Sequence, residues 1–252
     1  MDLKEIDIAN QNSNRHPWEQ ARVKVIRSLL NRIIDADKEL LVLDIGSGDM
    51  YVAGELLNHY PKAEFICIDT GYGQMGIQSN NSLTTFSTLD EFKRSTNKKV
   101  DVVLLLDVIE HIEDETGFLQ NLLKEEYITP ETSFVITVPA FQSLFSAHDR
   151  YLGHYRRYTI YSLQDRLNNA GLTTVKSNYF FFSLLLPRKW QQRRENTNET
   201  AFKGLGQWRG GNFVTTIVKT ILFIDFKIGQ LVSMIGIKLP GLSLYCICRK
   251  PA

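Results

Sequence analysis

Two hydrophobic patterns alternate along the chain. Mainly apolar runs, typical of strands buried on both faces of a sheet, lie at residues 40–45, 64–69, 100–107 and 133–139, and a less apolar strand is expected at 83–87. Between them, apolar residues recur with the period of an amphipathic helix, and the first such helix begins near Pro17, a residue suited to a first turn. Strands that alternate with helices predict βαβ units and a mostly parallel sheet.

The C-terminal part keeps this pattern only at its two ends. Residues 162–170 indicate a helix capped by a glycine, and strands are expected at 172–180 and 243–248. The residues between these two strands do not fit the βα repeat, because a polar and basic stretch leads into a long helical pattern over residues 214–235.

These patterns divide the chain into two parts. We interpret residues 1–37 as an N-terminal helical flank and residues 38–252 as one α/β domain. Within that domain, residues 181–240 form a helical and basic insertion before the last strand.

Charge and cysteine content restrict the partners. The 29 basic and 28 acidic residues give a net charge of +1, so nothing favours a nucleic acid partner. The three cysteines are too few for a disulfide framework, the first residues lack an apolar signal core, and no apolar run reaches the ~20 residues of a spanning helix. We expect a cytoplasmic protein, at most peripheral to the inner face of the membrane.

Three acidic residues, Asp44, Asp69 and Asp107, stand at the ends of predicted strands. In open α/β sheets, ligands bind beyond the carboxyl ends of the strands. After Asp44, the residues Gly46, Ser47 and Gly48 form a strand-to-helix turn that allows close approach of a ligand to the backbone.

The turn does not match a dinucleotide site. The third glycine of Gly-x-Gly-x-x-Gly is missing, and Asp49 stands where a pyrophosphate would meet the helix. A ligand with an ammonium and a sulfonium group would instead be attracted by Asp44, and Asp69 can accept hydrogen bonds from both hydroxyls of a ribose. These features favour S-adenosylmethionine.

The sequence resembles the class I S-adenosylmethionine-dependent methyltransferases over about residues 38–180 and the last strand. The resemblance rests on three segments: Asp44-Ile45-Gly46-Ser47-Gly48, Phe65-Ile66-Cys67-Ile68-Asp69 and Asp107-Val108-Ile109-Glu110-His111. It implies a doubly wound, Rossmann-like sheet of seven strands with the last strand antiparallel. It also implies a cofactor pocket lined by the glycine loop, Asp69 and the segment at Asp107. Met50 departs from the family, where many members have a third glycine, and we assign the adenine position to residues 87–90.

The segment after the fifth strand contains the residues that we expect to face the methyl acceptor. It is dense in His, Arg, Asp and Tyr and resembles a His-Asp…Gly-His-x-Arg-Arg-Tyr-Thr loop found in a subset of bacterial methyltransferases. Methyl transfer to a hydroxyl needs alignment and a base. His148 and His154 are the candidate bases, and Asp149 is the residue that orients either imidazole.

On the substrate side we place His111, Arg156 and Arg157, since guanidinium groups can clamp a carboxylate or phosphate. An alternative remains open, in which the two arginines fix the loop to the sheet through ion pairs with Asp107 or Glu110. We expect no metal, because Asp107, Glu110 and His111 do not complete a set of oxygen ligands.

Other methyltransferase subclasses lack their motifs here. No Asp/Asn-Pro-Pro-Tyr stretch follows the fourth strand, which disfavours methylation of exocyclic base nitrogens or glutamine amides, and no Pro-Cys nucleophile exists for cytosine-carbon chemistry. The insertion carries basic residues beside apolar ones, namely Arg188, Lys189, Arg193, Arg194, Lys203 and Arg209. Such a surface suits a lid over an apolar substrate or docking to an anionic membrane.

The sequence therefore predicts a methyltransferase that uses S-adenosylmethionine on a small-molecule or a lipid- or glycan-linked acceptor, at oxygen. Two alternatives stay open. One is a nicotinamide-dependent oxidoreductase, and the other is a regulator that binds the cofactor without turnover.

Overall fold

The computed structural model describes residues 15–75, 82–95, 97–197, 208 and 210–251. Its centre is one seven-stranded sheet with the order β3-β2-β1-β4-β5-β7-β6. The strands are β1 (Leu40–Ile45), β2 (Ala63–Ile68), β3 (Leu83–Phe86), β4 (Val102–Leu106), β5 (Ser133–Pro139), β6 (Thr173–Phe180) and β7 (Ser243–Arg249). The first five strands run parallel, and β7 is antiparallel to both of its neighbours, which confirms the expected fold class.

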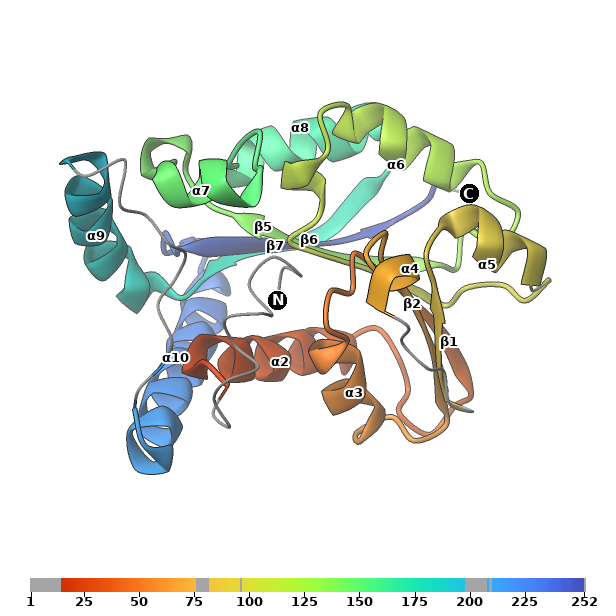
Figure 1. Cartoon of the computed structure of the whole chain (residues 1–252), viewed down its shortest axis with the longest axis horizontal. Helices are drawn as coiled ribbons and strands as arrows, with labels where there is room; N and C mark the ends of the chain where they lie inside the picture. The colour runs from red at the N-terminus through yellow and green to blue at the C-terminus, as the bar shows by residue number, and fades with distance from the viewer. Residues whose placement is uncertain (1–14, 76–81, 96, 198–207, 209, 252) are drawn as a thin grey trace.

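Helices cover both faces of this sheet. They are α2 (Pro17–Leu30), α3 (Tyr51–Leu57), α4 (Tyr72–Met75), α5 (Leu89–Ser95), α6 (Glu115–Leu123), α7 (Ala147–Leu152), α8 (Ile160–Ala170), α9 (Leu185–Thr197) and α10 (Asn212–Ser233). In Figure 1, α6 and α8 lie above the sheet, and α2, α3 and α10 lie below it. The molecule is thus a three-layer α/β/α arrangement.

The strand pattern explains the two cores between these layers. Successive side chains of a strand point to opposite faces. Leu41 and Leu43 therefore pack with Leu119 and Leu163 from α6 and α8, whereas Val42 packs on the opposite side with residues of α2 and α10. Because both faces are covered, most positions of the central strands are apolar, which is why the sequence shows continuous runs rather than alternation.

Several elements differ from the sequence-based prediction. The first helix ends at Leu30, although apolar residues at helical spacing continue to Ile33 and Ile34, and residues 89–95, for which no helix was predicted, form α5. The segment expected as a loop after β5 contains α7. Ser146 starts this helix with a capping box, in which its side chain accepts from a backbone N–H and Asp149 bonds back to the Ser146 backbone.

The segment between β6 and β7 contains α9 and α10, of which α10 packs along α2 and against β6. The helical pattern expected after residue 214 is confirmed by α10. Of the basic residues singled out in the sequence, Lys203 and Arg209 and the side chain of Arg194 lie outside the described residues. None of the described helices is long and apolar enough to cross a membrane.

Candidate functional site

A cavity of about 1140 Å³ opens at the carboxyl ends of the parallel strands. Its lining includes Gly46, Asp69 and Asp107 as well as His111, His154 and Arg188. The sheet order reverses between β1 and β4, so the cavity begins at the switch point where ligands of open α/β sheets bind.

The glycine loop keeps the backbone close to the cavity. Gly46 has φ +70°, and a Cβ at this position would lie 2.7 Å from Cγ2 of Val108. Gly48 has φ 55°, and Met50, where the resembled family often has glycine, still adopts φ 58°. The backbone at Met50 thus stays in the left-handed region, a conformation that costs a residue other than glycine about 1–2 kcal/mol. At Gly46 the neighbouring Val108 side chain leaves no room for a Cβ.

Asp69 lies at the cavity wall between two backbone donors. Its Oδ2 accepts from the Gly48 N–H at 3.0 Å, and its Oδ1 accepts from the Gly71 N–H at 3.0 Å. Each carboxylate oxygen retains a second lone pair. Asp69 can therefore hold the loop and still accept hydrogen bonds from a ligand.

Asp44 near the end of β1 and Ser47 within the glycine loop are not among the described residues that line the cavity. The Asp44 side chain is 2% exposed, and burial raises its pKa to about 7, against an opposing effect of Arg22. The Ser47 hydroxyl forms a 2.7 Å hydrogen bond with the Tyr72 hydroxyl. Both residues were expected to touch a ligand directly, whereas the structure places them outside this lining.

Asp107 is held by a residue that the sequence argument missed. Arg22 of α2 reaches across and pairs with Asp107 Oδ2 at 2.9 Å, while the Thr137 hydroxyl donates to Oδ1 at 3.0 Å. Asp107 also adopts φ 57°, unusual for a residue other than glycine. The signal was present in the sequence, because Arg22 interrupts the apolar stripe of its helix with a charge that needs a partner.

Asp149 is the centre of a buried network. Its side chain is 0% exposed and accepts from Arg157 Nε at 2.7 Å and from Arg157 Nη2 at 3.1 Å. The His154 ring bonds through Nδ1 to Oδ1 at 2.9 Å, and the Ser146 N–H donates to Oδ2 at 2.9 Å. Burial alone raises a carboxyl pKa, but the hydrogen bonds from His154 and Arg157 outweigh it and hold the pKa of Asp149 well below its usual range.

The two arginines of the loop have structural partners other than those considered from the sequence. Arg157 pairs with Asp149, and Arg156 pairs with Glu115 and donates to the backbone oxygen of Glu113 at 2.8 Å. Ion pairs with Asp107 or Glu110 were the wrong expectation, because α7 and α6 bring nearer carboxylates to the loop. Arg157 still lines the cavity, whereas Arg156 does not appear among its lining residues in the described chain.

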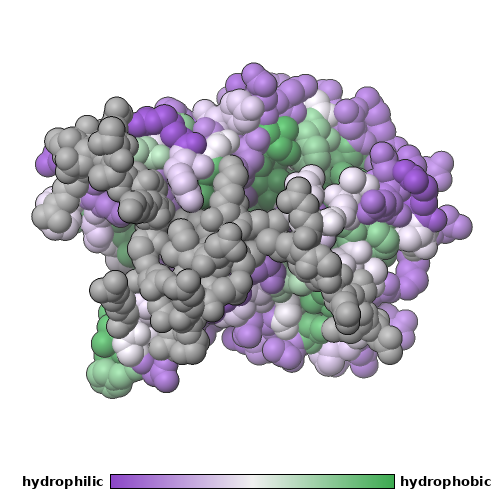
Figure 2. Space-filling view, viewed as in Figure 1, coloured by the Kyte–Doolittle hydropathy of each residue, from purple (hydrophilic) through white to green (hydrophobic). Residues whose placement is uncertain are grey.

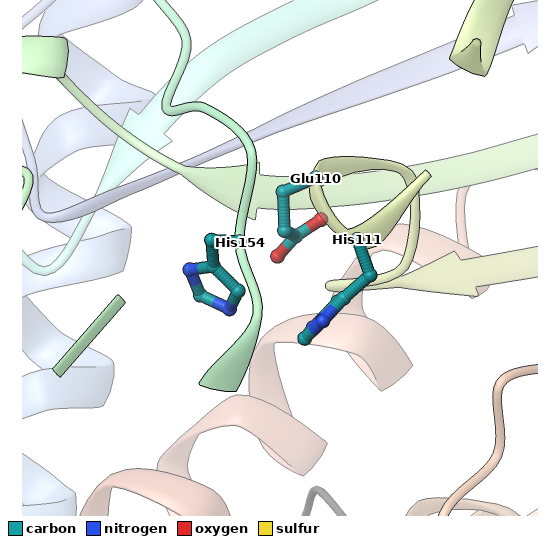
Figure 3. A group of neighbouring side chains, drawn as sticks. All are labelled: Glu110, His111 and His154. Carbon is teal, nitrogen blue, oxygen red and sulfur yellow. The ribbon is translucent and has the colours of Figure 1, made fainter. Parts of the chain in front are cut away.

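Glu110, His111 and His154 converge on the acceptor side of the cavity (Figure 3). The rings of His111 and His154 meet edge to face with centroids 4.5 Å apart. Glu110 is completely buried, and this burial, together with nearby Asp107, raises the pKa of its carboxyl well above the usual range. From the sequence, Asp107, Glu110 and His111 were considered as metal ligands, and no metal was expected. In the structure, His154 lies beside Glu110 and His111.

The remaining candidates also lie at the cavity. His148 on α7 lines it and is nearly buried. Of the segment assigned to adenine, Ser87, Thr88 and Leu89 line the wall. One cavity thus gathers most of the candidates on both sides.

Comparison with known proteins gives the family. A model described as a methyltransferase domain matches residues 18–177. The chain is 26% identical over 115 residues to a malonyl-[acyl-carrier protein] O-methyltransferase of Acetivibrio thermocellus, a match that covers 44% of this chain and 41% of that protein. The chain therefore matches less than half the length of this relative.

Solved structures share the fold. A SAM dependent methyltransferase from Archaeoglobus fulgidus has a TM-score of 0.51 and 20% identity, and the match covers 92% of this chain and 97% of that chain. A phospholethanolamine N-methyltransferase 2 of Haemonchus contortus, in complex with phosphomonomethylethanolamine and S-adenosylhomocysteine, has a TM-score of 0.53 and 14% identity, covering 93% and 53%.

Because the family model matches more than half of its length, the chain belongs to this family of methyltransferase domains. The class expected from the sequence, an S-adenosylmethionine-dependent methyltransferase, is confirmed, and with it the cofactor. The family membership also removes the nicotinamide-dependent oxidoreductase as an interpretation.

Proposed function

We propose that the protein transfers a methyl group from S-adenosylmethionine to an oxygen atom of a small-molecule or a lipid- or glycan-linked acceptor. The observation that carries the proposal is the cavity, which joins the Gly46–Gly48 loop to His154. A donor and an acceptor bound at its two ends would meet without solvent between them.

On the cofactor side, the proposed roles follow the position of each residue. Asp69 accepts hydrogen bonds from the ribose hydroxyls, and Gly46 and Gly48 give space for close approach of the methionine part. Asp44 acts through its charge, and residues 87–90 border the adenine. Ser47 supports the loop, and Asp107 borders the cavity next to the acceptor side.

On the acceptor side, His154 is the proposed base. Its Nδ1 is held by Asp149, so Nε2 is the nitrogen that can take a proton from the acceptor. The acceptor oxygen attacks the methyl carbon, the oxygen–carbon bond forms as the carbon–sulfur bond breaks, and the proton moves to Nε2. Asp149 is then a positioning residue, His148 is the second candidate base, and His111 and Arg157 border the acceptor. Arg156 fixes the loop.

Two observations support an acceptor that is carried by a larger molecule. The curated relative is named for an O-methyltransferase that acts on a carrier-linked acyl group. Helix α10 has an inverted pattern, since polar residues such as Asp225 and Gln230 are buried, whereas its outer face is apolar. Exposed on that face are Phe213, Val214, Ile217, Ile221, Ile224, Ile228 and Leu231.

We propose that this outer face of α10 docks on an anionic membrane surface, from which a lipid-linked acceptor enters the cavity. The single acidic residue of the helix, Asp225, is buried and accepts three hydrogen bonds from Phe182 and Ser183. The outer face of the helix therefore carries apolar side chains without a carboxylate. Figure 2 shows apolar residues exposed at the lower end of this helix.

Vesicle co-sedimentation tests the docking. The protein should bind vesicles that contain phosphatidylglycerol, and the double change Ile221→Glu with Ile228→Glu should abolish binding. Tyr161→Glu, which alters an 80% exposed residue of α8 on the other side of the sheet, is the matched control. Equal binding by the α10 variant, or none by the unaltered protein, would reject a membrane in favour of a soluble carrier-linked acceptor.

Calorimetric titration tests the cofactor side. S-adenosylmethionine and S-adenosylhomocysteine should bind and NADH should not. Asp69→Ala should weaken the first two by about tenfold to a hundredfold, the effect of losing hydrogen bonds to a charged acceptor. Asp165→Ala, an exposed aspartate of α8, should leave both affinities unchanged. Cofactor binding without methylation of any acceptor in a screen of hydroxylated small molecules and lipids would favour the regulator.

A further inference from the structure

Glu110 is a buried carboxylate without a partner. Its side chain is 0% exposed, and neither carboxylate oxygen has a hydrogen-bond partner in the described part of the chain. Two other buried carboxylates, Asp149 and Asp225, each accept several hydrogen bonds. A buried polar group without a hydrogen-bond partner is rare in native structures, so a chain that keeps one needs a reason.

Two imidazoles stand beside this carboxylate. One ligand atom each from Glu110, His111 and His154 lies within 4.8 Å of the other two. All three residues line the cavity, and Figure 3 shows their side chains converging from the segment after β4 and the segment before α8. The chain has thus brought two nitrogen donors and one oxygen donor to the same point from two separate segments.

The orientation of His154 is fixed by a third residue. Its Nδ1 bonds to Asp149, which is itself held by Arg157, so the ring presents Nε2 to the cavity side. A histidine ligand that is oriented by a carboxylate through its other nitrogen is a recurring feature of metal sites. The network would place Nε2 for a cation as well as for a proton.

We propose that Glu110, His111 and His154 bind a divalent first-row transition metal ion, with its remaining coordination positions open to the cavity. Two imidazoles and one carboxylate suit Zn²⁺, Mn²⁺ or Fe²⁺, whereas Mg²⁺ and Ca²⁺ prefer oxygen ligands. The ion would supply the positive counter-charge that the Glu110 carboxylate lacks. Arg22 and Arg157 are the nearest described cations that act on this carboxyl, and neither forms a hydrogen bond with it.

The catalytic role that we assign to this metal ion rests on the methyl transfer proposed above. An acceptor oxygen bound to the ion would have a lowered pKa and release its proton to water before it attacks the methyl carbon. The metal and the acceptor proton compete for the same Nε2 of His154. In the loaded protein His154 is a ligand, and in the metal-free protein it is the base.

Binding of Mn²⁺ alone tests the site without cofactor or acceptor. The whole chain, freed of metal with a chelator, is titrated with Mn²⁺ while electron paramagnetic resonance reports the free ion. We expect one bound ion per chain, displaced by Zn²⁺. Glu110→Gln should weaken binding by more than tenfold, and His148→Gln, a histidine of the same cavity outside the cluster, should leave it unchanged.

Two outcomes overturn the proposal: no stoichiometric Mn²⁺ or Zn²⁺ binding, or equal binding by Glu110→Gln. Should that variant fail to fold, His111→Asn at the partly exposed side of the cluster takes its place. Calorimetry with S-adenosylmethionine on the same samples separates the two proposals. Loss of cofactor binding in an intact metal site rejects the proposed function alone, and the reverse result rejects the metal site alone.

Discussion

Asp44 and Asp149 lie at the two sides of the site and are equally buried, with exposed fractions of 2% and 0%. Their pKa values nevertheless move in opposite directions. Burial raises the pKa of Asp44 to about 7. The same burial acts on Asp149, but the hydrogen bonds from His154 and Arg157 outweigh it and lower the pKa.

The difference shows how each side of the site is built. The acceptor side contains its own counter-charges, since Arg157 and His154 fix Asp149 without any ligand. On the cofactor side, backbone geometry forms the loop, and Asp44 keeps a carboxyl whose charge is costly in the free protein. A cationic ligand such as S-adenosylmethionine would reduce that cost. The acceptor side is therefore preformed in the free protein, whereas the cofactor side is completed by ligand binding.

The largest expected effect comes from removing the partner of Asp149. Arg157→Met should destabilise the protein by about 3–5 kcal/mol, because it removes two hydrogen bonds that a charged donor makes to a buried carboxylate. Urea unfolding at pH 7 measures this. The neighbouring change Arg156→Met is the control and should cost below about 1 kcal/mol, since Glu115 keeps Arg166 at 3.3 Å. Equal losses in the two variants would contradict a special role for the Asp149 network.

The next prediction concerns Asp44, whose replacement should stabilise the protein at high pH rather than destabilise it. A group whose folded pKa is raised contributes stability below its unfolded pKa and loses it as pH rises through the folded value. The free protein should therefore lose up to about 4 kcal/mol from Asp44 between about pH 4 and pH 7. Asp44→Asn should remove this dependence and be the more stable protein at pH 8.

Urea unfolding at pH 4, 6 and 8 gives the comparison. Asp149 titrates in the other direction, because its depressed pKa adds stability above its unfolded pKa that is lost only as the pH falls toward the folded value. A variant Asp44→Asn that keeps the full pH dependence between 4 and 7 would show that another group is responsible.

The cofactor side could be predicted from the sequence better than the acceptor side, and the reason is physical. A glycine turn after a buried strand is a local feature, so Gly46, Gly48 and the strand-end acid Asp69 could be placed from neighbouring residues alone. The number of strands and the antiparallel last strand followed from the family resemblance.

Contacts between distant segments could not be predicted in this way. The pairing of Arg22 with Asp107 joins residues of α2 and the end of β4, and the meeting of Glu110 with His154 depends on how the segment after β5 folds back. That segment could be recognised as rich in functional side chains, but the partners of Arg156 and Arg157 depend on helix α7 and on α6, which set the distances. The capping box of Ser146 and Asp149 was the one local signal for α7.

A third prediction tests whether the cofactor side depends on backbone geometry. Gly46→Ala places a Cβ 2.7 Å from Val108 in a left-handed residue, so we expect a loss of about 1–2 kcal/mol from the conformation alone and more from the clash. Val108→Ala in the same chain removes the clash and should restore only part of the stability. A complete rescue, measured by thermal unfolding, would mean that φ at Gly46 costs nothing and that packing alone selects glycine.

The smallest effect on stability is expected at His154, the second partner of Asp149. His154→Gln removes the hydrogen bond to Oδ1 of Asp149 but leaves those from Arg157 and Ser146, so the loss should be about 0.5–1.5 kcal/mol. Urea unfolding at pH 7 measures the loss, and calorimetry should find the affinity for S-adenosylmethionine within twofold of the unaltered protein, about 0.4 kcal/mol. A loss of stability as large as that of Arg157→Met would mean that the His154 imidazole serves as a structural counter-charge of Asp149. That result would contradict its proposed role as the base.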